Sequence, residues 1–275
     1  MPIFQHNGRI HAFIHIPKCG GTTIEAMLTD RFGDIGFLDE RYYGRTEPYR
    51  WSKCSPQHLV WDDFLRLIPE AMIDRVFTVT RHPLTRFASS YNFYARAGAV
   101  PAGMSPEEWF KQVAGSSDLL PFRADNHLRR QSEFVPDKAT VFRLEDGLQA
   151  VSDWLDAKFG VTGMGATRDG NVAPVPDDGR FQTVPLSASL RRNVETYYAD
   201  DFARFGYQPD PDREIVLTVP KPRRDSLASR LHIKLMARRI EHRVRRLESR
   251  ALTAATQIQR PIGPATRPNS QIRQR

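Results

Sequence analysis

The feature that most constrains the fold is an apolar segment that leads through a glycine pair directly into a helical pattern. Residues 11–16, His-Ala-Phe-Ile-His-Ile, have the composition of a short buried strand. Gly20 and Gly21 follow. The next residues carry an apolar face at helical spacing, made of Ile24, Met27 and Leu28. Thr22, with Glu25 three positions later, predicts a capping box at the start of that helix.

The alternation of strand and helix recurs along the chain. Residues 76–80 and 140–144 are apolar, β-branched segments, and each precedes a helical pattern. A last helix is expected over residues 187–202, whereas residues 34–51 and 169–185 are rich in loop-forming residues. Strands that alternate with helices are typical of an α/β fold with a central parallel sheet covered on both faces.

The positive charge of the chain is concentrated near its C-terminus. The whole sequence has a net charge of +8, but residues 221–275 contain 15 Lys and Arg against 3 Asp and Glu, a net charge of +12. Residues 1–220 therefore carry a net charge of −4, which disfavours a nucleic-acid-binding protein. Pro220-Lys221-Pro222 has the composition of a linker, so we expect a domain over 1–220 and a basic appendage over 221–275.

The composition limits the class of protein further. Hydrophobic residues make up 40% of the chain and charged residues 26%, as in globular proteins. The sequence has no run of about 18 apolar residues that would predict a membrane span, and its first residues lack the regions of a signal peptide. Two cysteines cannot form a disulfide framework. These features favour a cytoplasmic protein.

The segment Pro17-Lys18-Cys19-Gly20-Gly21-Thr22-Thr23 has the character of an anion-binding loop. Glycines let the backbone approach an anion, and the free N–H groups and dipole at a helix start favour negative charge. Lys18 adds a full positive charge. The loop is not a Walker A motif, because Lys18 precedes the glycines instead of following them. A Gly-Gly turn with a surface lysine is the competing interpretation.

The end of the second strand favours the anion-binding interpretation. Nucleoside-triphosphate hydrolases usually end a later strand in an Asp that holds Mg²⁺, whereas this strand ends in Thr80-Arg81-His82-Pro83. Arg81 can bind a second phosphate with two hydrogen bonds, and Ser89, two turns along the next helix, can donate another. The sequence therefore predicts a nucleotide site for phosphates at two separate places, without a metal.

These segments resemble the PAPS-dependent sulfotransferase family. Residues 17–23 resemble the loop that holds the 5′-phosphosulfate of PAPS, and residues 80–89 resemble the segment that holds its 3′-phosphate. The branch containing heparan sulfate 2-O-sulfotransferase and bacterial sulfotransferase family 2 proteins is also resembled by residues 55–59, 125–127 and 198–207. The resemblance implies a P-loop-like three-layer fold and transfer of a sulfuryl group from PAPS to a hydroxyl group, with release of PAP.

The implied reaction requires a base, because a hydroxyl group is a poor nucleophile until it loses its proton. Of the eight histidines, His58 resembles the base position of this branch. An ordinary loop histidine is the competing interpretation, and His127 is the reserve candidate. His15 is expected to be a buried structural residue. Lys18 is expected to stabilise the charge on the leaving oxygen.

The acceptor is expected to be carbohydrate-like or another small molecule. Candidate acceptor contacts are Arg86, Asn126, His127 and Arg130. For each arginine, a solvated surface residue is the competing interpretation. Cys19, beside Lys18, could be a reactive thiol.

The basic appendage carries an apolar stripe at heptad spacing from Ile233 to Ile258. Contact between copies of the chain and binding to an anionic surface, such as acidic lipid or polyanionic sugar, are favoured equally. A solvated amphipathic helix lying on the domain is the competing interpretation. The residues from about Gln259 onward have the composition of disordered chain.

Two other functions stay open. An ATP-dependent small-molecule kinase would share the fold, but the position of Lys18 and the absence of a strand-end Asp speak against it. A polyanion-binding module with a vestigial site would share the charge, but an intact Lys18, Arg81 and Ser89 speak against that.

Overall fold

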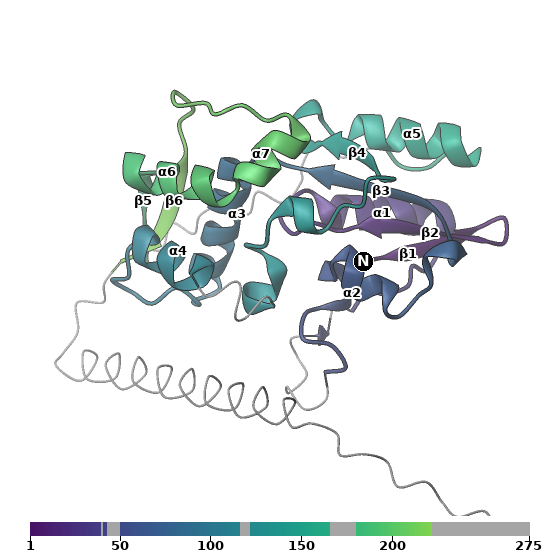
Figure 1. Cartoon of the computed structure of the whole chain (residues 1–275), viewed down its shortest axis with the longest axis horizontal. Coiled ribbons are helices and arrows are strands. Elements are labelled where there is room, and N and C mark those ends of the chain that lie inside the picture. Colours follow the sequence, from purple (N-terminus) through teal and green to yellow (C-terminus); the bar gives the residue numbers. More distant parts are fainter. Residues whose placement is uncertain (40, 43–49, 116–121, 166–179, 222–275) are drawn as a thin grey trace, which may run out of the picture. The chain divides into compact units, whose positions relative to one another are not determined.

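The structure is a computed structural model that describes residues 1–39, 41–42, 50–115, 122–165 and 180–221 (Figure 1). The expected amphipathic helix and its contacts fall in residues 222–275, outside the described part of the chain. None of the described helices combines the length and the apolarity that crossing a bilayer requires.

A four-stranded sheet forms the centre of the fold, in the order β1-β2-β3-β4. Its strands are β1 (Ile3–His6), β2 (Arg9–Ile14), β3 (Ile73–Thr80) and β4 (Thr140–Arg143). The last three are parallel, with Ile14 opposite Thr78 and Thr80 opposite Arg143. The predicted α/β class with a mostly parallel central sheet is therefore confirmed.

Strand β1 was not predicted from the sequence. It pairs antiparallel with β2 through a two-residue turn at Asn7 and Gly8, whose φ angles are 49° and 73°. Two left-handed residues are what a tight hairpin turn requires, and Asn-Gly is the sequence that favours it. The four-residue strand is too short to show a period of its own.

Helices cover both faces of the sheet (Figure 1). On one face, α1 (Gly21–Phe32) and α5 (Gln149–Phe159) pack on Phe13 and Phe77 in one apolar cluster. A larger cluster contains Ile14 and Val76, whose side chains point to the opposite face because the direction alternates along a strand. This cluster includes residues of α3 (Pro83–Arg96), α2 (Trp61–Leu65), α4 (Pro106–Ala114), α6 (Ala188–Tyr197) and α7 (Ala199–Phe205).

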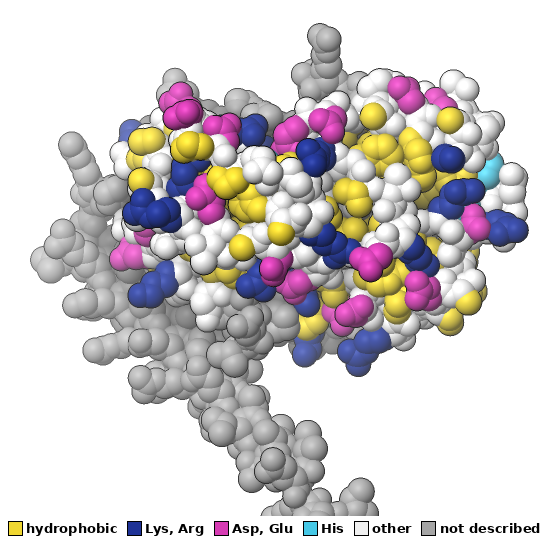
Figure 2. All heavy atoms as spheres, turned by 45° about the horizontal axis from the view of Figure 1, so that its top comes forward, with side chains coloured by type: hydrophobic (Ala, Val, Ile, Leu, Met, Phe, Trp, Pro, Cys, Tyr) yellow, Lys and Arg dark blue, Asp and Glu magenta, His cyan; other side chains and the backbone are white. Residues whose placement is uncertain are grey.

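Short 3₁₀ turns connect these elements. They span Pro56–His58, Glu70–Met72, Arg123–Asn126, Gln131–Glu133 and Leu144–Asp146. Two of them, Pro56–His58 and Arg123–Asn126, carry candidate site residues. Over the face drawn in Figure 2, cationic and anionic side chains of the described residues are interspersed, in keeping with the small net charge of residues 1–220.

Strands β5 (Phe181–Pro185) and β6 (Val216–Pro220) were not predicted from the sequence. Strand β5 falls within the expected loop, and it pairs antiparallel with β6. Strand β6 packs on α3, where the backbone N–H of Thr218 donates to Oδ1 of Asn92 at 2.7 Å. The core therefore continues beyond the last helix expected from the sequence. The helix expected over 187–202 is divided into α6 and α7, because Tyr198 leaves the helical conformation between them (φ −101°, ψ 22°).

The contribution of β6 to the core predicts where the chain can be shortened. Leu217 and Val219 of β6 and Ile215 directly before it are buried, and the burial of the three side chains contributes together roughly 5 kcal/mol. This is comparable with the whole free energy of unfolding of a typical domain, about 5–15 kcal/mol. We expect residues 1–221 to unfold cooperatively at the temperature of the full chain and residues 1–208 to be unfolded, as measured by circular dichroism. Equal melting of the two shortened chains would contradict the role given to β6, and an unfolded 1–221 would place residues 222–275 in the core.

Candidate active site

The anion-binding loop predicted over residues 17–23 joins the carboxyl end of β2 to the start of α1. Gly20 is the N-cap of α1, and no side chain caps the helix start. The predicted capping box is wrong: the carboxylate of Glu25 instead hydrogen bonds Nδ1 of His15 at 2.6 Å. Thr22 is exposed and Thr23 half-buried. The helix start is therefore free of a protein anion from its own first turn.

Gly21 is required because His15 occupies the space beside it. A Cβ atom at position 21 would lie 1.9 Å from Nε2 of His15. His15 is buried, as expected, and the hydrogen bond between its Nδ1 and the accepting carboxylate of Glu25 holds its ring in place. The backbone of the loop can therefore pack directly on an imidazole only when residue 21 has no side chain.

Arg81, at the carboxyl end of β3, lies against the loop. Its Nη1 donates to the carbonyl of Lys18 at 3.1 Å, and its Nε donates to Oγ1 of Thr85 at 3.2 Å. The structure therefore brings together the two segments in which the sequence predicted phosphate contacts. Ser89 is half-buried on α3, and its hydroxyl makes no hydrogen bond within the described residues.

Gln131 fixes the backbone of Arg81 and was not identified from the sequence. The N–H of Arg81 donates to Oε1 of Gln131 at 2.9 Å, and Nε2 of Gln131 donates to the carbonyl of Arg81 at 2.8 Å. Asp201, which is fully buried, accepts hydrogen bonds from the N–H groups of Gln131 and Ser132, each at 2.8 Å. Both partners lie far along the chain from Arg81, so no local pattern indicates them.

Lys18 lies in a cationic environment. Its Nζ is 4.4 Å from the centre of the Phe93 ring. Burial, with smaller contributions from nearby Arg96 and Arg81, lowers the pKa of Lys18 to about 8. Within the described residues no carboxylate lies within ion-pair distance of Lys18 or Arg81. An anion bound here would relieve the repulsion among these cations.

Cys19, in contrast, is not a reactive thiol. It is 1% exposed, and burial raises the pKa of its thiol to about 12. Its thiol donates a weak hydrogen bond to Oε1 of Gln131, with Sγ 3.4 Å from that oxygen. Because the thiolate is the reactive form, the expectation of a reactive Cys19 is wrong.

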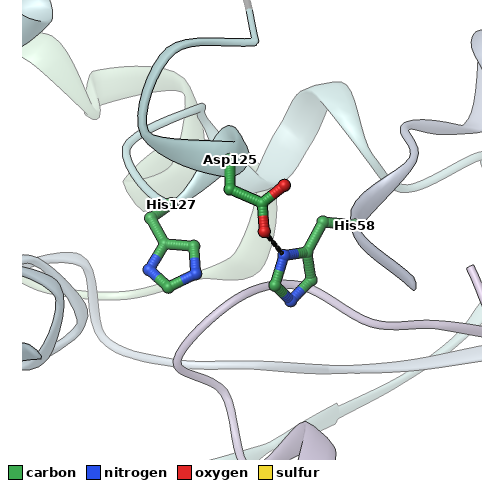
Figure 3. Close-up of side chains that lie close together, drawn as sticks. All are labelled: His58, Asp125 and His127. Atoms are coloured by element: carbon green, nitrogen blue, oxygen red, sulfur yellow. Dashed lines mark hydrogen bonds and ion pairs between the residues drawn. The ribbon is translucent and has the colours of Figure 1, made fainter. Parts of the chain in front are cut away.

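His58 and Asp125 form a buried pair (Figure 3). Nδ1 of His58 lies 2.5 Å from Oδ2 of Asp125. Burial lowers the pKa of His58 to about 4, against the opposing effect of Asp125, so the ring is neutral near pH 7. A neutral imidazole whose Nδ1 faces a carboxylate can accept a proton at Nε2. Asp125 was part of a segment noted in the sequence, but it was not singled out as a site residue.

His127 and His15 flank His58. The ring centres of His58 and His127 are 5.2 Å apart, and those of His58 and His15 are 4.7 Å apart. His127 is buried, and burial lowers its pKa well below the ordinary value. Its Nδ1 has no hydrogen-bond partner among the described residues. The structure thus brings together both candidate bases.

The candidate acceptor contacts are less available than expected. Arg86 is 1% exposed and donates to the carbonyls of Pro17, Arg129 and His127 at 2.9 to 3.1 Å. The side chain of Arg86 is therefore enclosed and bonded to the backbone. This differs from both interpretations of the sequence, an acceptor contact and a solvated surface arginine.

Asn126 and Arg130 also have protein partners. Nδ2 of the buried Asn126 donates to the carbonyl of His58 at 2.9 Å. Nε of Arg130 donates to the carbonyl of Tyr197 at 2.9 Å, and its guanidinium lies over the ring of the same residue. Asn126 therefore supports the backbone that carries His58, and Arg130 is half-exposed with its guanidinium already in contact with Tyr197.

His58, Asp125 and His127 are also of the residue types that bind transition metals. One possible ligand atom from each lies within 4.8 Å of the others. Two ligands on one tetrahedral zinc ion would be roughly 3.3 Å apart, given metal–ligand distances of about 2.0 Å. The 2.5 Å separation of the His58 and Asp125 atoms is that of a hydrogen bond. The cluster as arranged is a hydrogen-bonded pair beside a second histidine.

The model of the sulfotransferase family matches residues 10–208, which is more than half of the chain. The chain belongs to the sulfotransferase family. The matched region contains the loop after β2, His58, Arg81 and Asp125. No curated protein and no solved structure matches the chain. Family membership supports sulfuryl transfer as the general activity of this sulfotransferase.

The contact between Gly21 and His15 predicts a defined substitution effect. Gly21→Ala places Cβ against an imidazole that cannot move away without breaking its bond to Glu25. Overpacking of this kind costs about 1–3 kcal/mol, so we expect a lower free energy of unfolding in urea titrations. Thr22→Ala, in the same helix turn but exposed, is the matched control and should change little. A Gly21→Ala variant as stable as the control would contradict the packing described.

Proposed function

We propose that this sulfotransferase moves the sulfuryl group of PAPS to a hydroxyl group of a carbohydrate-like or other small acceptor and releases PAP. The observation that carries the proposal is the contact between Arg81 and the Lys18 carbonyl, which unites two cationic segments in one place. In a family of sulfotransferases, a bisphosphorylated nucleotide is the donor that such a site suits. No metal ion is required by this proposal.

The proposed nucleotide site is of the P-loop-like kind. The 5′-phosphosulfate would be held by the loop after β2, through its backbone N–H groups, its hydroxyl groups and its lysine. The loop residues are Lys18, Cys19, Gly20, Gly21, Thr22 and Thr23. Arg81 and Ser89 would hold the 3′-phosphate, with Arg81 binding as a fork. The uncapped helix start at Gly21 and the hydroxyl of Ser89, which has no partner in the part of the chain that the structure describes, support this division.

The proposed chemistry is an in-line transfer. Nε2 of His58 takes the proton of the acceptor hydroxyl while its oxygen forms a bond to sulfur. The bond from sulfur to the bridging oxygen breaks, and its electron pair stays on the 5′-phosphate of PAP. Lys18 stabilises that charge. Asn126, His127 and Arg130 remain proposed acceptor contacts, and His127 remains the alternative base.

A kinase is the second candidate from the same class of fold. The residue after the buried end of β3 is Arg81, where a metal-binding carboxylate would be expected. This favours the sulfotransferase reaction over ATP-dependent phosphoryl transfer. The two buried free cysteines accord with the proposed cytoplasmic location. A contact of the basic appendage with an anionic surface or a second copy of the chain remains a prediction.

The nucleotide assignment predicts which ligand stabilises the protein. In EDTA, PAP at 100 times its Kd should raise the free energy of unfolding by about 2.7 kcal/mol, measured as a higher Tm. ATP should give a smaller shift, with or without Mg²⁺, and Arg81→Ala should lose most of the PAP shift. A larger shift with ATP that depends on Mg²⁺ would reject the proposed donor in favour of a kinase.

The lowered pKa of Lys18 predicts how PAP binding depends on pH. Below about pH 8 the free protein carries the ammonium form, which attracts the anion, and above it the neutral amine predominates. PAP affinity should therefore fall steadily between pH 7 and pH 9.5 in calorimetric titrations, a range set by the lysine pKa. Lys18→Arg keeps its charge throughout and should bind PAP almost independently of pH. The same decline in both proteins would show that another group is responsible.

A further inference from the structure

We propose that Asp125 is a positioning residue that holds His58 with its proton on Nδ1, so that Nε2 is the atom that accepts the proton of the acceptor. The use of this tautomer in transfer rests on the proposed function. The tautomer itself does not, because it follows from contacts within the protein.

The carboxylate of Asp125 is the meeting point of several donors. The N–H of Ser55 donates to Oδ1 at 2.6 Å, and the hydroxyl of Ser55 donates to Oδ2 at 2.8 Å. Nδ1 of His58 lies 2.5 Å from the same Oδ2. Oγ of Ser55 also lies 3.0 Å from Nδ1 of His58, but its single proton is donated to Oδ2 of Asp125 at the shorter distance of 2.8 Å. Because an ionised carboxylate can only accept hydrogen bonds, the 2.5 Å contact requires the proton on Nδ1 of His58. Nε2 makes no hydrogen bond to any described residue, which leaves it available to a bound acceptor.

The backbone that carries Asp125 is held in an unusual conformation. Ala124, Asp125 and Asn126 have φ angles of 51°, 50° and 62°, so three consecutive residues other than glycine are left-handed. This conformation costs about 1–2 kcal/mol per residue. Such strain persists where the surrounding structure imposes it, and it often occurs at functional sites.

The turn is fixed from both sides. The hydroxyl of Tyr94, on α3, donates to the carbonyl of Ala124 at 2.7 Å. At the other end, Nδ2 of Asn126 donates to the carbonyl of His58 at 2.9 Å. Two consecutive side chains therefore hold one histidine, Asp125 by its ring and Asn126 by its backbone. A right-handed turn would point these neighbours in other directions, so the strained conformation serves to aim both at His58.

The test is ¹⁵N NMR of the full chain labelled at histidine, at pH 7, because imidazole nitrogens that carry a proton differ in chemical shift from those that do not. His58→Gln assigns the His58 signals. In the wild-type protein we expect Nδ1 to be protonated and Nε2 to be unprotonated. In Asp125→Asn the amide can donate to Nδ1, so we expect the proton to move largely to Nε2. Asp137→Asn, which changes a fully exposed carboxylate, is the matched control and should leave the His58 signals unchanged.

Three results would overturn the inference. The first is a proton on Nε2 of His58 in the wild-type protein. This result needs no variant, so the proposal can be rejected even if the Asp125→Asn protein does not fold. An unchanged tautomer in a folded Asp125→Asn protein would show that other contacts set it. Joint shifts of the His58 and His127 signals after dialysis against EDTA would show that these residues hold a metal instead.

A transfer assay separates this inference from the proposed function. With PAPS as donor and a panel of hydroxyl acceptors, Asp125→Asn should lower kcat by about 10²-fold or more, the usual contribution of a general base. Its Tm shift with PAP should stay that of the wild type. Failure of the wild type to bind PAP would reject the proposed donor while leaving the tautomer intact, whereas normal kcat in Asp125→Asn would reject the positioning role.

Discussion

The buried guanidinium of Arg86 joins the parts on which the candidate site depends. From α3 it donates to Pro17, where the anion-binding loop begins, and to His127, directly after the left-handed turn. Within the described residues no carboxylate lies within ion-pair distance of it, so carbonyl dipoles and the ring of Tyr198, 5.8 Å away, compensate its charge. Each buried carbonyl left without its donor would cost about 1–3 kcal/mol. The relative placement of the loop and the turn therefore depends on this side chain.

A second link runs through His15. Its ring lies between the backbone of Gly21 and the ring of His58, and Glu25 of α1 holds it there. The loop that would bind the nucleotide and the residue that would act as base thus share a packed neighbour. A change in either is expected to be felt by the other, because close-packed interiors transmit small displacements.

Local patterns predicted much of the fold and fewer of its partners. The strands at β2, β3 and β4 were recognised because apolar, β-branched segments are followed by helical spacing. Strands β5 and β6 were missed: β5 is largely exposed and has no alternating apolar pattern, and β6 packs on α3, which is distant in the sequence. The predicted capping box was wrong because the carboxylate of Glu25 accepts a hydrogen bond from His15, which precedes the helix that carries Glu25.

The sequence by itself determined the class of fold, the glycine loop with Lys18, and the cation at the end of β3, since each depends on residues that are neighbours in the chain. Only the tertiary structure decided which groups support them. His58 and Asp125 are 67 positions apart, Arg81 and Gln131 are 50 apart, and Arg86 and Pro17 are 69 apart. Periodicity and motif spacing report on a few turns of chain, and hydrogen bonds across such separations exist only once the sheet has aligned its strands. For the same reason the sequence could not distinguish Arg86 from a solvated arginine. The carbonyls that accept its hydrogen bonds come from distant parts of the chain, and they are known only from the tertiary structure.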